Sequence, residues 1–174
     1  NDCESLSCVT LSSYETNIAM NSFNNCKSLT KLILGSSIYH IEESKMNKIS
    51  TINEIIIPNS VTSISSKAFS MCSNLTQIII PHSVKEIGSG AFIGCSSLQK
   101  ITIHSEIEKI EADMFIKCDS LKNIEIPTSV KSIGSRAFNA CKSLKKIIIP
   151  SSVHEIGEKA FFECQNLQEI SIPS

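Results

Sequence analysis

Tryptophan is absent from the 174-residue sequence, and Arg136 is the only arginine. Nucleic-acid surfaces need a strong positive field and bidentate phosphate contacts, whereas the formal net charge is -1. We therefore expect no nucleic-acid partner. No apolar run approaches the roughly eighteen residues of a membrane-spanning helix, so no membrane span is expected. The hydrophobic content of 41% is nevertheless sufficient for the core of one globular domain.

The sequence is dominated by a 23-residue repeat, and this period is within the range of leucine-rich repeats. Phenylalanine recurs at this spacing, and the bulky Met46 fills the one gap. Cysteine follows three positions later, with Ile49 as the exception. The phenylalanine column contains Phe23, Phe69, Phe92, Phe115, Phe138 and Phe161, and the cysteine column contains Cys3, Cys26, Cys72, Cys95, Cys118, Cys141 and Cys164.

Each unit combines three segments, as the unit that starts at Leu98 illustrates. Leu98, Ile101 and Ile103 follow an L-x-x-I-x-I pattern whose end alternates like a short strand. A V-x-x-I segment follows, and then A-F-x-x-C, which predicts one helical or 3-10 turn. Proline ends the strand in most units because it cannot extend a hydrogen-bonded ladder. These prolines are Pro58, Pro81, Pro127, Pro150 and Pro173.

A single unit buries too little apolar surface to offset the entropy of ordering its backbone, so the units must stack. We predict one domain over residues 1–174 with about 7.5 repeats. The chain begins inside a unit and ends just after a strand, which suggests a fragment of a longer array with uncovered core edges at its ends. Association of copies through those ends is the alternative.

The unit L-x-x-I-x-I-P-x-S-V-x-x-I-G-x-x-A-F-x-x-C resembles the BspA-type leucine-rich repeat of bacterial surface proteins and parasitic protozoa. The match covers Cys3 to Ser174 and weakens between Glu42 and Ile49, where Lys45 and Met46 replace alanine and phenylalanine. The resemblance implies an α/β class, right-handed solenoid with a parallel concave sheet and short helical, 3-10 or β segments on the convex side. It also implies a noncatalytic role in adhesion or protein binding, at the cell surface or secreted. A cytoplasmic location is the alternative.

Gly88-Ser89-Gly90 is similar at first sight to a phosphate-binding loop. Such a loop opens a long helix, but Cys95 closes the repeat unit within about one turn. Gly134 and Gly157 share the repeat position of Gly88, whereas Gly90 and Gly94 recur at no repeat position. A structural turn is therefore the preferred interpretation, and we expect no cofactor.

The cysteine column suggests either disulfides or a metal site, and its geometry favours neither. Stacked neighbours would have Cβ atoms about 4.8 Å apart, which exceeds the separation that a disulfide favours. All sulfurs would also point the same way, whereas zinc needs converging ligands. We expect reduced, buried thiols and no metal. Cys8 lies outside the column, and we interpret it as a tolerated surface residue rather than a reactive thiol.

Two other motifs have weak functional interpretations. His82 and His104 should approach each other on adjacent turns, but a metal site would need a third ligand, so we interpret both as solvated turn residues. Asn74-Leu75-Thr76 matches a glycosylation sequon, which matters only if the protein is secreted.

The residues that flank the second anchor of each strand should project from the concave face, because side chains alternate along a strand. In one of these columns, Ile33, Ile56 and Ile79 form an apolar stripe, which commonly marks an interface. Strand propensity alone explains such residues equally well. We predict a protein-binding face formed by Lys31, Ile33, Glu54, Ile56, Gln77, Ile79, Lys100, Thr102, Asn123, Glu125, Lys146 and Ile148.

We expect this face to bind a protein partner. The competing hypothesis is a self-assembling or intracellular scaffold, in which the isoleucine stripe or the open ends join copies into a homo-oligomer. No set of residues predicts an enzyme.

Overall fold

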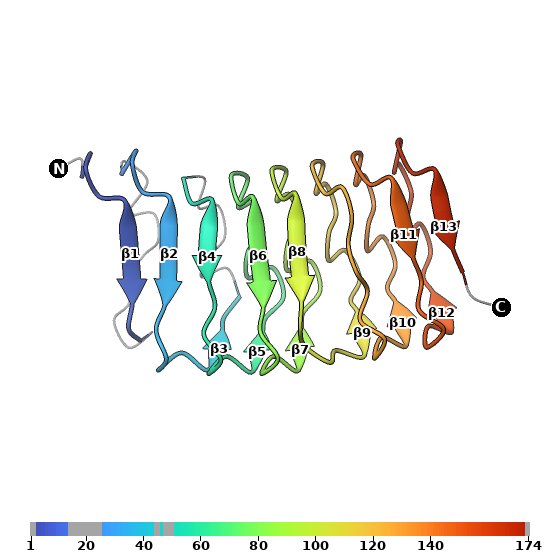
Figure 1. Ribbon diagram of the computed structural model, residues 1–174, viewed down its shortest axis with the longest axis horizontal. Coiled ribbons are helices and arrows are strands. Elements are labelled where there is room, and N and C mark those ends of the chain that lie inside the picture. The colour runs from blue at the N-terminus through green and yellow to red at the C-terminus, as the bar shows by residue number, and fades with distance from the viewer. Residues whose placement is uncertain (1–2, 14–25, 44–45, 47–50, 173–174) are drawn as a thin grey trace.

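The computed structural model describes residues 3–13, 26–43, 46 and 51–172, and in it the chain winds as a parallel β-solenoid (Figure 1). The strands of the described residues form a front row of longer strands and a second row of two-residue strands. The front row contains β1 (Cys8–Leu11), β2 (Lys31–Leu34), β4 (Glu54–Ile56), β6 (Gln77–Ile80), β8 (Lys100–Ile103), β11 (Lys146–Ile148) and β13 (Glu169–Ser171). The second row contains β3 (His40–Ile41), β5 (Ser63–Ile64), β7 (Glu86–Ile87), β9 (Lys109–Ile110), β10 (Ser132–Ile133) and β12 (Glu155–Ile156).

Residues 23 positions apart pair directly across neighbouring strands, so the coils stack in the register of the repeat. Leu32 pairs with Ile55, and Ile55 pairs with Ile78. The front row divides into the sheets β1-β2-β4-β6-β8 and β11-β13, and the second row into β3-β5-β7 and β9-β10-β12. The predicted stacking and the short β segments of the second row are confirmed.

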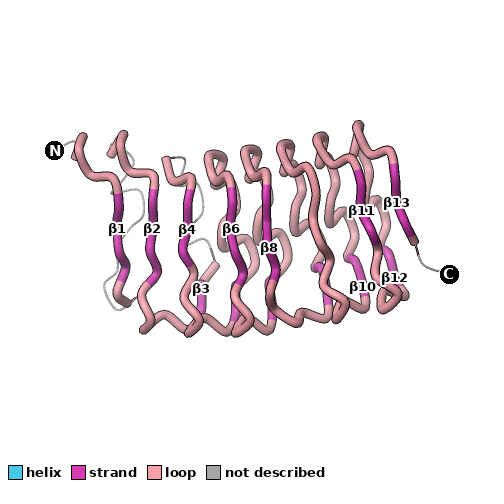
Figure 2. Tube along the Cα trace, viewed as in Figure 1, coloured by secondary structure: helices cyan, strands magenta, loops and turns pink. Residues whose placement is uncertain are grey.

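The A-F-x-x-C segment is not helical, which corrects the prediction of a helical or 3-10 turn and with it the α part of the fold class. The described residues contain no helix (Figure 2). Amides at alternate positions of the segment donate hydrogen bonds to carbonyls of the next coil, as Phe69 N–H does to the carbonyl of Ala91 at 2.9 Å. The amides between them close turns, as Cys72 N–H does onto the carbonyl of Phe69 at 3.2 Å. An α-helix would use all of these amides internally.

Two left-handed residues per coil impose this alternation. Lys67 and Met71 have φ angles of 55° and 62°, and Gly90 and Gly94 occupy the same two positions in the next coil with 64° and 71°. The two glycines therefore do belong to repeat positions, although most other units use a side-chain residue there. A left-handed residue ends a helical run. The further left-handed residues are Asp113, Lys117, Arg136, Ala140, Lys159 and Glu163.

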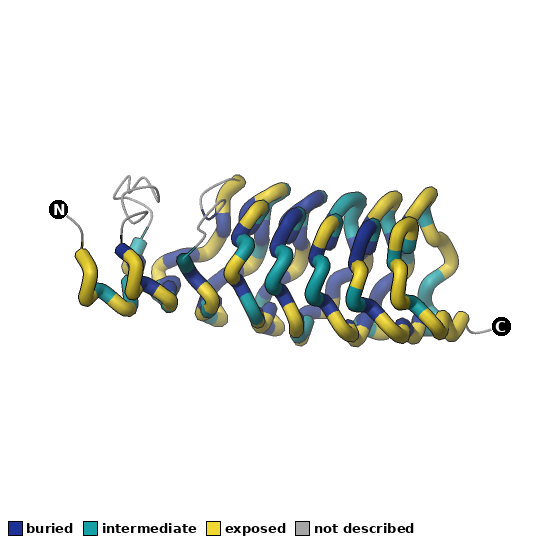
Figure 3. The backbone as a smooth tube through the Cα atoms, turned by 90° about the horizontal axis from the view of Figure 1, so that it is seen from above, coloured by how far each residue is buried: buried dark blue, intermediate teal, exposed yellow. Residues whose placement is uncertain are grey.

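The core contains a ladder of stacked phenylalanine rings. Figure 3 shows that buried backbone segments recur from coil to coil along the stack. Phe92 and Phe115 are fully buried, and their ring centroids lie 5.5 Å apart at an interplanar angle of 7°. The same stacking continues from Phe69 to Phe161. Met46 is also fully buried, as its place in the column predicts. Phe23, Lys45, Ile49 and Pro173, which stand at the phenylalanine, alanine, cysteine and proline positions of the repeat, lie outside the described residues.

Cys95, Cys118 and Cys141 of the cysteine column lie buried beside the rings as reduced thiols. Each described thiol from Cys72 onward donates to the carbonyl of the core residue 26 positions earlier. Cys118 Sγ, for example, lies 3.3 Å from the carbonyl oxygen of Phe92. Burial raises the pKa of Cys95 and Cys118 well above the ordinary thiol value, and the neighbouring cysteines raise it further. Cys95 and Cys118 therefore stay protonated and satisfy carbonyls inside the stack.

The front row is interrupted at residues 123–126. Ile124 and Ile126 remain buried there, yet within the described chain no backbone hydrogen bond joins this segment to β8 or β11. In the preceding coil, His104 stands at the position of the usual proline, and Glu106 stands at a position where other coils have serine. In the next coil this serine is Ser129, whose hydroxyl donates to the carbonyl of Ile107 at 2.8 Å. The second row is interrupted between β7 and β9. We call residues 123–126 the seam.

Candidate protein-binding face

In β2, β4, β6 and β11, side chains alternate between the core and the outward side. Ile55 and Ile78 are 4% and 2% exposed, whereas their neighbours Ile56 and Ile79 are 39% and 58% exposed. The alternation follows from the pleat, which sends successive side chains to opposite sides of a strand. We call the outward side of the front row the strand face.

All of the predicted binding residues lie on the strand face, although they differ in exposure. Ile148 is 58% exposed, and Ile33 is half-buried between β1 and β4. The seam interrupts the face at Asn123 and Glu125, which are exposed but belong to no strand. Half-buried are Lys31, Ile33, Glu54 and Thr102, and exposed are Ile56, Gln77, Ile79, Lys100, Asn123, Glu125, Lys146 and Ile148.

A shallow, mainly apolar groove of about 310 Å³ lies on the strand face where β4 and β6 end. Ile56 and Ile79 are among its lining residues, together with Pro81, His82 and His104 from the turns that follow the strands. Polar groups at its margin come from Glu54, Asn59 and Gln77. The volume is near the lower end of the range for ligand pockets.

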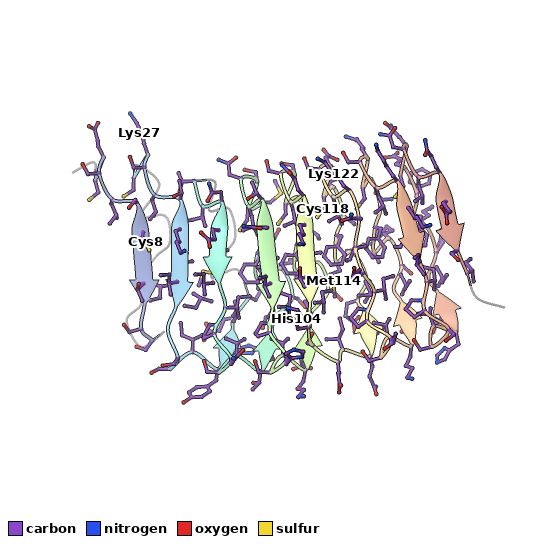
Figure 4. All side chains as sticks on the ribbon, in the orientation of Figure 1. Cys8, Lys27, His104, Met114, Cys118 and Lys122 are labelled. Atoms are coloured by element: carbon purple, nitrogen blue, oxygen red, sulfur yellow. The ribbon has the colours of Figure 1, made fainter. Side chains whose placement is uncertain are left out.

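The two histidine rings stack on each other, with centroids 5.1 Å apart and an interplanar angle of 28°. His104 occupies the proline position of its coil, and His82 follows the proline of the coil before, so their side chains meet diagonally. Figure 4 shows His104 at the end of β8, opposite the end where Lys122 lies. The predicted proximity of the histidines is confirmed. Their role as part of the groove lining was not predicted.

Charges on the strand face are mostly paired between neighbouring strands. Lys31 Nζ lies 3.3 Å from Glu54 Oε2, and Lys146 Nζ lies 2.7 Å from Glu169 Oε1. Lys100 occupies the same repeat column but faces Gln77, its partner in the register. Among the residues that the structure describes, no carboxylate forms an ion pair with Lys100.

The other motifs of the sequence have structural explanations. A Cβ atom at Gly88 would lie 2.3 Å from the backbone nitrogen of Ser66, so glycine there permits close approach of two coils. Cys8 is half-buried at the start of β1 rather than exposed as predicted. Asn74 is exposed in a turn, while Leu75 of its sequon is fully buried. Over the described residues, no three metal-ligating side chains converge, and no helix has the length and apolarity to cross a bilayer.

The fold and the repeat together define a leucine-rich repeat solenoid, a class of scaffold that binds protein partners and has no catalytic machinery of its own. The family model described as "BspA type Leucine rich repeat region (6 copies)" matches residues 1–122 and 108–174. The chain belongs to this family.

Solved structures of bacterial proteins share the fold. A leucine-rich repeat protein from T. pallidum is 33% identical with a TM-score of 0.64, over 82% of this chain and 58% of that one. A leucine-rich cell surface protein from Faecalibacterium prausnitzii A2-165 is 28% identical with a TM-score of 0.65, over 99% of this chain and 61% of that one. A leucine-rich repeat protein from Eubacterium ventriosum is 19% identical with a TM-score of 0.72, over 94% of this chain and 47% of that one.

The chain thus spans 58% and 61% of the length of the first two solved relatives. The comparison with curated proteins gave no match.

Proposed function

We propose that the protein is a noncatalytic binding module that attaches to another protein through the strand face, in adhesion or host contact at the cell surface. The observation that carries this proposal is the outward exposure of Ile56 and Ile79 side by side over an apolar groove. Contiguous apolar surface of this kind commonly marks an interface. The printed description of the F. prausnitzii relative as a cell surface protein supports the location.

The decisive experiment compares two lysine variants that remove equally exposed apolar side chains from different sides of the coil. Ile79→Lys changes the strand face, where Ile79 is 58% exposed. Met71→Lys changes the turn side, where Met71 is 50% exposed and Lys117 already occupies the same repeat position. Both variants should fold, because neither side chain belongs to the core.

Beads coated with the wild-type protein, or with either variant, are tested for attachment to cultured epithelial cells. Attachment should fall severalfold for Ile79→Lys and stay at the wild-type level for Met71→Lys. Equal losses for both variants, or no loss for Ile79→Lys, contradict binding through the strand face. Ile56→Lys should behave like Ile79→Lys and keep the thermal stability of the wild type. If Ile56→Lys unfolds the protein, the assignment of inward and outward columns is wrong.

A second candidate function is self-assembly through the strand face. Ile79 and Ile148 are each 58% exposed there, and exposed apolar surface of this kind can pair with a copy of itself. Light scattering over a concentration series separates the two functions. A mass that stays at one chain at all concentrations contradicts assembly, whereas a mass that rises with concentration and returns to one chain in Ile79→Lys supports it.

A further inference from the structure

The groove combines an apolar surface with an unpaired cation at one side, and this combination has consequences for the partner. Ile56 and Ile79 line the groove, and Gln77 lies at its margin. Lys100 is the direct neighbour of Gln77 on the next strand and is exposed. Neighbouring strands are about 4.8 Å apart, so Lys100 lies one strand spacing from Gln77, which lines the groove.

The pairing of the other lysines in this column shows why Lys100 is distinctive. Lys31 and Lys146 are each neutralised by a glutamate on the adjacent strand, at 3.3 Å and 2.7 Å. The equivalent neighbours of Lys100 are Gln77 and, across the seam, Asn123, neither of which carries a charge. A carboxylate of a bound partner would therefore find this cation uncompensated.

The geometry also limits how such a partner is shaped. A large side chain lying over Ile79 would also contact the stacked rings of His82 and His104, which line the same groove. From there to Lys100 the path crosses one strand spacing and part of the β6 strand. In an extended chain, side chains at positions i and i+2 lie on the same side, roughly 6.6 Å apart. The diagonal from Ile79 to Lys100 is roughly 8 Å between backbones, and the long lysine side chain can span the difference.

We propose that the groove receives an extended partner segment with the pattern apolar-x-acidic, whose apolar side chain lies against Ile56 and Ile79 and whose carboxylate pairs with Lys100. The proposal rests on the proposed function and specifies the chemistry of its partner. The apolar anchor supplies affinity through burial, and the ion pair supplies selectivity against neutral or basic segments.

The test uses three synthetic nonapeptides. The first is Gly-Ser-Gly-Phe-Ser-Asp-Gly-Ser-Gly with blocked ends. The second replaces Asp by Asn, and the third replaces Phe by Ser. Each is titrated into the whole chain while NMR follows the side-chain methyl signals of Ile56 and Ile79 and the imidazole signals of His82 and His104.

The Phe-Ser-Asp peptide should shift these signals and bind about two- to fivefold more tightly than the Phe-Ser-Asn peptide, as an exposed ion pair permits. The Ser-Ser-Asp peptide should leave them unshifted. In Lys100→Gln, the two phenylalanine peptides should bind equally well. Lys131→Gln removes an exposed lysine on the second row and should preserve the preference. Added salt should reduce the preference in the wild type.

Two results overturn the proposal in different ways. If the Asp and Asn peptides bind the wild type equally, or if Lys100→Gln keeps the preference, Lys100 does not select the partner, and the proposed function is unaffected. If no peptide shifts the isoleucine signals, the groove does not receive an apolar-x-acidic segment. The cell-attachment comparison of Ile79→Lys and Met71→Lys then decides separately whether the strand face binds a partner at all.

Discussion

Replacing Phe115 by alanine should destabilise the protein far more than the same change at the end of the phenylalanine ladder. Phe115 is fully buried between Phe92 and Phe138, at ring-centroid distances of 5.5 Å and 5.3 Å. Removal of a buried phenylalanine side chain typically costs about 3–5 kcal/mol, because transfer energy is lost and a cavity remains. Two stacking contacts are lost as well, so we expect the upper part of this range.

Phe161 provides the matched control, because it has the same position in the last coil. It is only partly buried and stacks on one ring, that of Phe138, at 5.5 Å. Its exposed part already lies in water, so we expect a loss of about 1–2.5 kcal/mol for Phe161→Ala.

Urea denaturation followed by far-UV circular dichroism measures both losses. Natural domains are stable by about 5–15 kcal/mol, so Phe115→Ala should still fold at low urea concentration, with a lower midpoint. A conservative Phe115→Leu should recover most of the loss, since it leaves a smaller cavity. The reasoning is refuted if Phe115→Ala costs under about 1 kcal/mol or no more than Phe161→Ala.

Three further predictions concern the thiols, the turns and the seam. Unfolded thiols ionise near pH 8.5, whereas burial raises the pKa of Cys118 in the folded chain, so the contribution of this thiol to stability is constant below about pH 8.5 and falls above it. In urea titrations up to pH 10.5, Cys118→Ala should make the decrease of the free energy of unfolding with pH shallower by about 1.4 kcal/mol per pH unit. An unchanged slope would refute the raised pKa of Cys118. Lys117→Gly should raise the free energy of unfolding by about 0.5–1 kcal/mol and raise the urea midpoint with it, because Lys117 has a φ of 58°, which glycine adopts at lower cost. A lower midpoint contradicts this reasoning. In hydrogen exchange, the amides of Asn123 and Glu125 should exchange more than about tenfold faster than the amide of Lys100. The Lys100 amide donates to the carbonyl of Thr76 at 3.3 Å. Equal rates would show that the seam is hydrogen-bonded to a neighbouring coil.

The 23-residue period predicted which side chains face inward, because any in-register stack sends one repeat column to one environment. It placed Ile55 inside and Ile56 outside, and the structure agrees. Periodicity carries little information about backbone hydrogen bonds. The left-handed positions of the A-F-x-x-C segment are occupied by residues such as Lys67 and Met71. Because glycine does not recur at these positions, the sequence contained no indication of positive φ angles, and a helical turn was predicted instead.

The groove was only half predictable for a related reason. The isoleucines could be found as an outward column of the repeat, but His82 and His104 fall in different columns and meet only diagonally. A useful signal was the replacement of the column proline by His104. The same coil has Glu106 at the serine position, and the seam follows it. Departures from the repeat sequence thus mark the coils whose structure differs from that of the neighbouring coils.

The distance between Gln77 and Glu169 tests most directly whether every coil advances the stack by one strand spacing. Both residues are exposed on the strand face, and the repeat places them four spacings apart, which corresponds to about 19 Å between their backbones. Spin labels attached through ketone-bearing amino acids avoid the native thiols and permit pulsed electron resonance measurements at these two positions. A single distribution centred at about 20 Å, broadened by the labels, is the predicted result. A maximum beyond about 35 Å would mean that the coils do not stack across the seam, and the strand face described above would not exist.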